Sequence, residues 1–239
     1  MESKSIQQMK NKILLLLSMC VLWSCCYTEK YIGEQYLGVK YILDPLGEEV
    51  APDTDPLIRF DAFDCVTFVE TVLVDGNVKK MRDIRYKNGQ VNFISRNHFI
   101  SLDWLQNNKN MFENISKKYG KTAIRTAVID KQNWFKVVHN MDVSIPKQTV
   151  QMEYVPYAEL QDIKTDKPLL VMFIVDNPKI IDKIGTDLIV SHMGFLLPNG
   201  KFRHASSQYG RVVDVAFKEY INKRAENKNN LGITLLEIK

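Results

Sequence analysis

The sequence predicts an α+β protein in which helices pack on an antiparallel β-sheet. Helical patterns lie mainly in the early part of the chain, and strand patterns gather after residue 166. The chain has 239 residues, of which 45% are hydrophobic and 25% are charged, an ordinary composition for a globular protein. Because no internal repeat or low-complexity linker interrupts it, we expect one domain after the N-terminal segment.

Two helices and a loop are expected first. The segment EKYIGEQYLGVKYIL (29–43) predicts a short helix, followed by a loop that carries several prolines. In DCVTFVETVLVDG (64–76) the apolar residues fall at helical spacing, and Gly76 can end that helix. Beyond it, IRYKNGQVNF (84–93) predicts a β-hairpin with a type I′ turn at Asn88-Gly89, and residues 101–120 predict a further helix.

The later elements are mostly strands. Residues 167–176, 187–197, 201–206 and 232–239 are apolar, strand-like runs. Between the last two of these, residues 214–226 predict a helix with Asp214 as its N-cap. The lysines of NKRAENKNN, which follow, are interpreted as solvated surface.

The N-terminus has the pattern of a secretory signal. Three lysines within residues 1–12 precede the apolar run ILLLLSMCVLW, which is too short to span a bilayer. The run ends in LWSC, with Leu22 three positions and Ser24 one position before Cys25, as in bacterial lipoprotein processing sites. We expect residues 1–24 to be a signal peptide and Cys25 to carry the lipid anchor. Plain secretion with cleavage nearby is the alternative.

The net charge and its distribution do not favour a nucleic-acid-binding protein. The net charge is +4, and loss of residues 1–24 removes three lysines and one glutamate, which lowers it to +2. No run of Lys or Arg has the density of a nucleic-acid footprint. No later segment is long and apolar enough for a transmembrane helix.

The cysteines separate into two groups. Cys20 leaves with the signal, and Cys26 adjoins the predicted anchor at Cys25. Only Cys65 lies in the folded body, so a disulfide framework is excluded and a lone reactive thiol is indicated. If Asp61 or Asp64 caps the following helix, the helix N–H groups and dipole favour the thiolate of Cys65 and can hold an oxyanion. Inert packing of the thiol is the alternative.

A thiol nucleophile needs a histidine as base, and four are present: His98, His139, His192 and His204. Between the last two, residues 198–200 (PNG) suit a three-residue hairpin loop. The loop pairs residue 197 with residue 201, so His204 faces Gly194 and both histidines point to the same side of the sheet. A two-residue loop would place them on opposite faces.

These motifs resemble a known family. FDC at a helix start, SHMGFL, and RHAS with its histidine twelve residues after the first are similar to NlpC-type, papain-like cell-wall cysteine hydrolases. YLGVKYI resembles their LGxPY segment, with Lys40 in place of the proline. Val66-Thr67 follows the cysteine where the endopeptidase branch has Ser-Gly, so the chain more closely resembles the N-acetylmuramoyl-L-alanine amidase branch. The resemblance covers most of residues 33–222.

The resemblance implies a papain-like fold for residues 25–239, with an inserted recognition segment at about 77–150. It implies Cys65 as nucleophile, His192 as general base and acid, and His204 as the residue that orients His192. No cofactor or metal is implied, and the substrates are muropeptides. By analogy with the family, we expect a monomer on the outer membrane of a Gram-negative bacterium, facing the periplasm.

Six residues are predicted to line the substrate site. Tyr41 and Asp64 match lining residues of the family, although Asp64 can equally be only a cap. Within SRNHFISLDW, Arg96, His98, Asp103 and Trp104 are predicted to recognise the muropeptide, through hydrogen bonds to hydroxyls or carboxylates and through stacking on a sugar. Alternatively, these four residues fix the inserted segment to the body, as His139 is expected to do.

Three other functions remain open. The first is cleavage of the γ-D-glutamyl–diamino acid bond in the stem peptide by the same chemistry. The second is a lipoprotein that binds muropeptides without cleaving them. The third is a zinc site at Cys65, His192 and His204, although no CxxC or HExxH spacing is present and no fourth ligand is evident.

Overall fold

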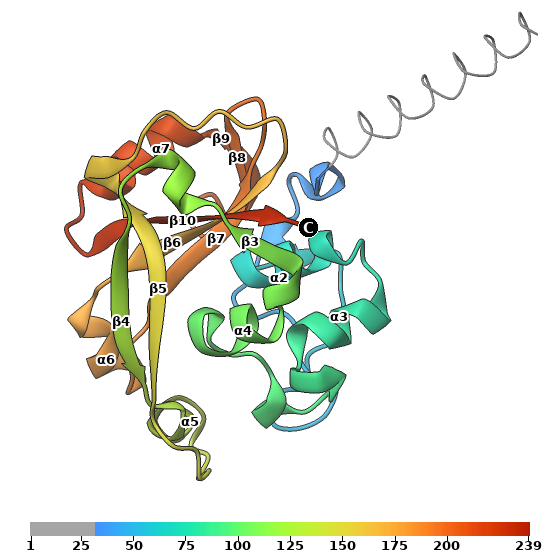
Figure 1. The fold of residues 1–239 in the computed structure, drawn as a ribbon. Coiled ribbons are helices and arrows are strands. Elements are labelled where there is room, and N and C mark those ends of the chain that lie inside the picture. Colours follow the sequence, from blue (N-terminus) through green and yellow to red (C-terminus); the bar gives the residue numbers. More distant parts are fainter. Residues whose placement is uncertain (1–31) are drawn as a thin grey trace, which may run out of the picture.

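A ten-stranded, mostly antiparallel sheet runs through the computed structural model, which describes residues 32–239 (Figure 1). The strand order is β2-β1-β9-β8-β7-β6-β10-β5-β4, and β3 pairs with β10 outside this path. Only the short β1–β2 pair is parallel. The predicted α+β class, with helices on a mostly antiparallel sheet, is confirmed. The predicted signal peptide and the predicted anchor Cys25 lie outside the described residues.

The elements follow one another along the chain in this order. The strands are β1 Lys40–Tyr41, β2 Ala62–Phe63, β3 Phe112–Asn114, β4 Ala123–Ile129, β5 Gln148–Pro156, β6 Leu169–Val175, β7 Val190–Leu196, β8 Lys201–Ser206, β9 Arg211–Ala216 and β10 Asn230–Ile238. The helices are α2 Cys65–Leu73, α3 Val78–Arg85, α4 Leu105–Asn107, α5 Lys131–His139, α6 Pro178–Ile184 and α7 Phe217–Ala225. Short 3₁₀ turns connect several of them.

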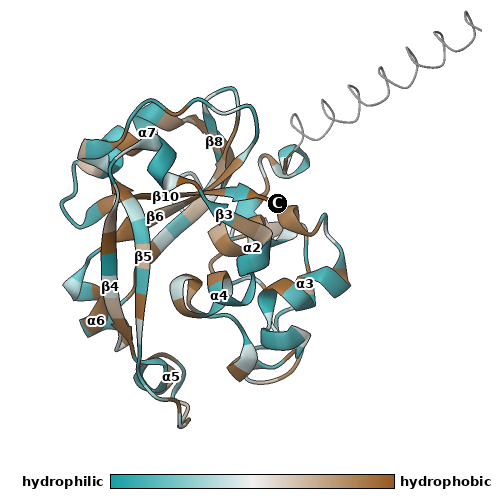
Figure 2. Ribbon diagram, viewed as in Figure 1, coloured by the Kyte–Doolittle hydropathy of each residue, from teal (hydrophilic) through white to brown (hydrophobic). Residues whose placement is uncertain are grey.

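The sheet is buried on both faces at its centre. Every residue of β6 is buried, and alternate side chains of a strand point to opposite faces. Leu170, Met172 and Ile174 join the core that includes residues of α2, whereas Leu169, Val171 and Phe173 join a second core with residues of α7. Figure 2 shows apolar residues along β6 and polar residues over the outer helices. The sheet therefore separates α2 from α7.

The predicted hairpin at 84–93 is wrong, although its turn is present. Asn88 and Gly89 both have positive φ, and the N–H of Gln90 donates to the carbonyl of Lys87 at 3.2 Å. No strand flanks this turn, because residues 78–85 form α3, which buries Met81 and Ile84 on one face. A turn signal fixes the local backbone but not what precedes it.

The predicted helix over 101–120 is also wrong. A π-helical turn at Ile100–Trp104 leads into α4, and then come a 3₁₀ turn, β3 and a second 3₁₀ turn. The side-chain amide of Asn108 donates to the carbonyls of Ile84 and Trp104 at 2.8 Å each. Asparagine thus competes for backbone groups that a continuing helix would use. Pairing of β3 with β10 uses the following residues.

The helix predicted over 29–43 is present only as a 3₁₀ turn at Glu34–Tyr36 within the described part, before β1. Gly33 and Gly38 have φ values of 68° and 86°, which a right-handed helix cannot contain. The late elements agree better with expectation: β6, β7, β8, β10 and α7 are all present where predicted. The strands β4, β5 and β9 were not predicted.

The predicted N-cap role of Asp214 is wrong. Ala216 occupies that position, and Asp214 lies in β9 opposite Arg203. Its two carboxylate oxygens accept from Nε and Nη2 of Arg203 at 2.7 and 2.9 Å.

Between residues 32 and 239, no helix has the length and hydropathy to cross a membrane.

Candidate active site

The predicted nucleophile Cys65 is the first residue of α2, and Asp64 caps that helix. Oδ1 of Asp64 accepts from the amides of Val66 and Thr67 at 3.1 and 2.8 Å, and the Thr67 hydroxyl accepts from the Asp64 amide at 2.9 Å. This capping box satisfies amides that the helix leaves unpaired. Of the two predicted cap residues, Asp64 holds the position, and Asp61 pairs with Arg59 instead.

The predicted register of the β7–β8 hairpin is confirmed. Phe195 pairs with Arg203 and Leu196 with Phe202, and the Leu197 amide donates to the Lys201 carbonyl at 2.8 Å. The loop therefore spans three residues, 198–200. Gly194 then lies so close to β8 that a Cβ at this position would be 2.8 Å from the Cβ of His204.

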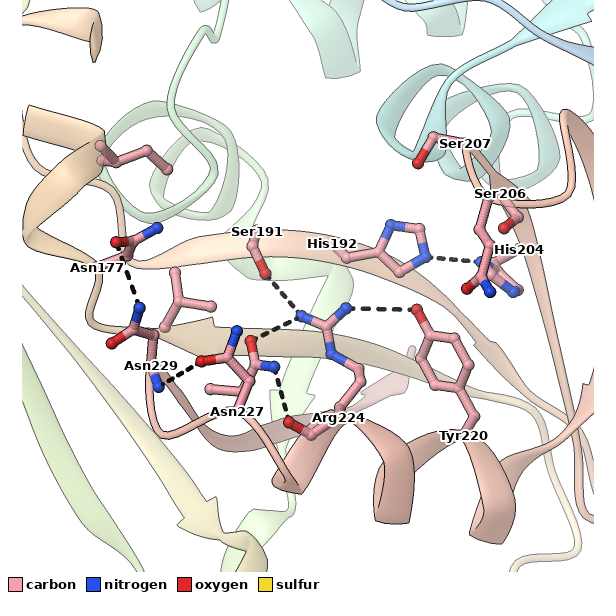
Figure 3. Close-up of a pocket in the computed structure, with 14 residues that line it drawn as sticks. Asn177, Ser191, His192, His204, Ser206, Ser207, Tyr220, Arg224, Asn227 and Asn229 are labelled. Atoms are coloured by element: carbon pink, nitrogen blue, oxygen red, sulfur yellow. Dashed lines mark hydrogen bonds between the residues drawn. The ribbon is translucent and has the colours of Figure 1, made fainter.

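The two histidines of this hairpin are hydrogen-bonded to each other. Nε2 of His192 lies 2.7 Å from Nδ1 of His204, with the ring centroids 4.8 Å apart (Figure 3). When the Nε2 of His192 carries the shared proton, its Nδ1 is left free to accept another from a thiol. His204 is 1% exposed, and its other nitrogen is buried without a partner among the described residues.

Both histidines are held in the neutral form. Burial lowers the pKa of His192 well below its usual value, and His204 and Arg224 act in the same direction. Burial and then the charge of Arg224 lower the pKa of His204 to about 4. An unprotonated imidazole is the form that a general base needs.

Cys65 lies beside β7, half-buried. Helix α2 packs against β7, and the amide of Met193, the residue after His192, is one of the groups that lower the pKa of the Cys65 thiol. Burial, followed by the charge of Asp64, raises the pKa of the thiol to about 12, against the opposing effect of nearby amides. The helix start alone therefore does not yield a thiolate, contrary to the expectation from sequence.

Tyr41, another predicted lining residue, lies on β1 near this thiol. Burial raises its pKa to about 12, and Cys65 and Asp64 add to the shift. The phenol thus keeps its proton at neutral pH and remains a hydrogen-bond donor.

A cavity of about 320 Å³ borders the histidine pair. Its wall contains His192 and His204 at one end and four asparagines, three serines and a glutamine around the rest. Within residues 32–239, Arg224 is the one lining residue of fixed charge. Figure 3 shows the Arg224 guanidinium between Ser191 and Tyr220. Sequence reasoning did not single out Arg224.

Comparison with known proteins assigns a family to this site. A family model described as AmiA-like, N-acetylmuramoyl-L-alanine amidase-like, matches residues 31–230. The chain belongs to the AmiA-like family. No sequence among the curated proteins matches this AmiA-like chain.

Two solved structures show the same fold as this AmiA-like protein. A Legionella pneumophila protein of the DUF1460 family is 26% identical, with a TM-score of 0.81 over 98% of this chain and 96% of the other. An N-acetylmuramoyl-L-alanine amidase from Bacteroides uniformis is 20% identical, with a TM-score of 0.67 over 90% of this chain and 99% of its own. Family membership makes this chain amidase-like.

Two of the predicted recognition residues of the AmiA-like chain are buried in a polar network. Arg96 is 4% exposed, and its guanidinium donates to Glu48 at 2.8 and 2.6 Å and to Asp53 at 2.6 Å. Trp104 has no exposed surface, and its indole donates to Glu70 at 3.0 Å. As these side chains lie, neither offers a free face or donor to a sugar.

The other two predicted recognition residues also make internal contacts. Nε2 of His98 lies 2.7 Å from the carbonyl of Phe93. Asp103 accepts from Lys131 at 2.8 Å. None of the four lines the cavity beside His192, so the structure does not bring them to the histidine pair. His139 lies against His98 in the same aromatic cluster.

The third alternative from sequence was a zinc site. Over residues 32–239, no group of three or more His, Cys, Asp or Glu side chains is arranged to hold a metal ion.

Proposed function

We propose that this protein is a cysteine-dependent N-acetylmuramoyl-L-alanine amidase of the papain-like, NlpC type. Its substrates are muropeptides, and it cleaves the amide between N-acetylmuramic acid and L-alanine. The observation that carries the proposal is the 2.7 Å contact between His192 and His204. The predicted nucleophile Cys65 begins α2, and this helix packs against β7, the strand that carries His192. A neutral imidazole oriented by a second imidazole is suited to nucleophilic acyl transfer from a thiol.

The reaction begins from a neutral pair. Because the pKa of Cys65 is raised and that of His192 is lowered, the resting site holds a thiol and an imidazole rather than an ion pair. Attack of the sulfur on the lactyl carbonyl transfers the thiol proton to Nδ1 of His192. His204 accepts the Nε2–H of His192 through Nδ1 and so fixes the tautomer that the transfer needs.

The same groups complete the turnover. The developing oxyanion is held by the amide of Cys65, which is not among those that Asp64 binds. His192 protonates the nitrogen of L-alanine as the C–N bond breaks, which leaves a thioester on Cys65. His192 then removes a proton from water, which attacks the thioester; the C–S bond breaks, the sugar acid is freed, and His192 returns the proton to the Cys65 sulfur. Tyr41 lies beside the thiol as a protonated lining residue.

Digestion of a defined muropeptide, with the products weighed by mass spectrometry, tests the proposal. The expected products are the intact muramyl sugar and a peptide that begins with L-alanine. Cys65→Ala and His192→Ala should each lower kcat by at least 10³-fold. Release of a muramyl-L-alanyl-D-glutamate and of a peptide that begins with the diamino acid would instead assign the endopeptidase reaction, and binding without any product would assign a muropeptide-binding protein.

A reagent test separates the cysteine mechanism from a metal mechanism. Iodoacetamide should inactivate the enzyme, and muropeptide should protect it, whereas EDTA should leave both activity and unfolding temperature unchanged. Loss of activity in EDTA that zinc restores would contradict the cysteine mechanism.

We further propose that the mature protein is exported, monomeric and anchored through Cys25 to the outer membrane, facing the periplasm. The sequence pattern before Cys25 supports this proposal. Cys25→Ala should move the protein from the membrane fraction to the soluble or unprocessed fraction, and Cys26→Ala is the matched control. An unchanged distribution of Cys25→Ala would contradict the anchor.

A further inference from the structure

Arg224 is a cation placed in the cavity beside the histidine pair. It lies on α7, and its Nη2 donates to the hydroxyl of Ser191, the residue before His192, at 2.9 Å. Its Cζ lies 4.5 Å from the centroid of the Phe173 ring, and Phe173 pairs with His192 across β6 and β7. The guanidinium and the His192 ring thus border the same aromatic side chain.

The guanidinium is not saturated by the protein. Besides Ser191, its partners are the Tyr220 hydroxyl at 3.4 Å and Oδ1 of Asn230 at 3.3 Å, and all three are neutral. A guanidinium has five N–H donors; among the described residues, one N–H of Nη1 and the N–H of Nε are left without a partner, and Nε is buried. Among the residues that the structure describes, none that lines the cavity is acidic. A half-buried cation in such surroundings is suited to an external anion.

The chemistry of the site says which part of the substrate enters this cavity. In the reaction proposed above, His192 protonates the nitrogen of the leaving peptide, so that nitrogen must lie against the His192 ring. The cavity begins at this ring and extends to Arg224. Its neutral wall of asparagine and serine side chains offers both donors and acceptors, which match the amides of a peptide.

We propose that Arg224 binds a carboxylate of the departing peptide, namely the α-carboxylate of the glutamyl residue that follows L-alanine. The inference rests on the proposed amidase function, because that function sends the peptide to the His192 side. Charge-assisted hydrogen bonds from a guanidinium outweigh neutral ones. Arg224 therefore makes the enzyme selective for stem peptides whose glutamyl carboxyl is free rather than amidated.

A pair of substrates that differ in one group tests the inference. They are muramyl-L-alanyl-D-glutamate and its α-carboxamide, measured with the wild type, Arg224→Gln and Arg224→Lys. The wild type should prefer the carboxylate by about 10- to 100-fold in kcat/KM, mainly through KM. Arg224→Gln should abolish the preference, because it should lower kcat/KM far more for the carboxylate than for the carboxamide, and Arg224→Lys should restore part of it.

Two controls complete the experiment. Lys223→Gln removes a neighbouring positive charge from α7 at an exposed position outside the cavity, and it should keep the full preference. An equal loss on both substrates in Arg224→Gln, or a wild type without preference, would overturn the inference and assign Arg224 a structural role.

Calorimetry separates this inference from the proposed function. The released L-alanyl-D-glutamate and its α-amide are titrated into Cys65→Ala, with and without Arg224→Gln. If the carboxylate peptide binds more tightly than its amide, and Arg224→Gln removes this difference, the inference is supported even if no substrate is cleaved. A lack of cleavage would contradict only the amidase proposal. Equal binding of the two peptides would overturn the inference whatever the activity.

Discussion

Gly194→Ala is predicted to separate the two histidines with a single methyl group. The ideal Cβ at this position lies 2.7 Å from the carbonyl oxygen of Arg203 and from Cζ of Phe202, and 2.8 Å from the Cβ of His204. Ordinary contacts begin at 3.4 Å, so each falls short by 0.6–0.7 Å. The backbone of Gly194 does not have a positive φ, and the strain is therefore steric alone.

The methyl group can be accommodated only if β8 moves away from β7. Two of its three neighbours are fixed by the strand itself, namely a backbone carbonyl and a Cβ, and Phe202 is fully buried. Overpacking of this kind costs about 1–3 kcal/mol, which for a protein of this size lowers Tm by about 2–12 °C. A shift of half an ångström or more would also lengthen the 2.7 Å contact between the histidines, and we expect kcat to fall about 10²-fold.

The assay combines urea denaturation with turnover of a defined muropeptide. Gly210→Ala is the matched control, because it has a positive φ of 66° and open space around the added methyl. It should lose about 1 kcal/mol of stability through backbone strain and keep full kcat. A Gly194→Ala protein with unchanged stability and kcat would refute the argument that close approach at this glycine aligns the pair.

Three further predictions concern charge. Because burial lowers the pKa of His192, kcat/KM at pH 5.5 should stay within about twofold of its value at pH 7.5, whereas a base with the usual pKa near 6.5 would lose about tenfold; a pH–rate profile decides. With a pKa of about 4 in the folded state, His204 binds fewer protons when the protein is folded than when it is unfolded. Its contribution to stability is therefore present above about pH 6.5 and is lost as the pH falls toward 4, by about 3 kcal/mol in all. In urea denaturation, His204→Gln should show a correspondingly smaller loss of stability in acid, and a loss identical to that of the wild type would contradict the prediction. Glu70→Ala should cost about 3–5 kcal/mol, because Glu70 accepts from both Arg85 and the Trp104 indole, and Glu70→Gln should cost less; equal costs in denaturation would show that the charge does not matter.

The register of the β7–β8 hairpin was predicted correctly because it depends on whether the loop has an odd or an even number of residues. The three-residue loop at 198–200 decides which residues of β7 and β8 face each other, and each later residue alternates sides. The meeting of His192 and His204 therefore followed from loop chemistry alone, and the distance of 2.7 Å between Nε2 of His192 and Nδ1 of His204 agrees with it. The capping of α2 by Asp64 is local in the same sense. Predictions of this kind need only a few neighbouring residues.

Residue roles that depend on tertiary pairing were not predictable in the same way. Arg96 and Trp104 have the chemistry of sugar-binding residues, but their partners Glu48, Asp53 and Glu70 lie 34–48 positions away in the sequence. No pattern within the segment 95–104 reveals that these partners will be present. The side chains of Arg96 and Trp104 therefore make their hydrogen bonds inside the protein, where they hold α2 and the loop before it against the segment after α3.

Arg224 presents the opposite case, because sequence reasoning did not single it out and it lies at the candidate site. Its neighbours over residues 222–228 are exposed and, except for Ala225, polar, which favours a solvated helix end. What brings it to the cavity is the packing of α7 through Phe217 against the second core, together with the ring of Phe173 under its guanidinium. Whether a buried or half-buried arginine can bind a ligand thus depends on whether acidic side chains of the protein already pair with it. The folded chain shows that Arg96 is paired with Glu48, whereas none of the described residues that line the cavity around Arg224 is acidic.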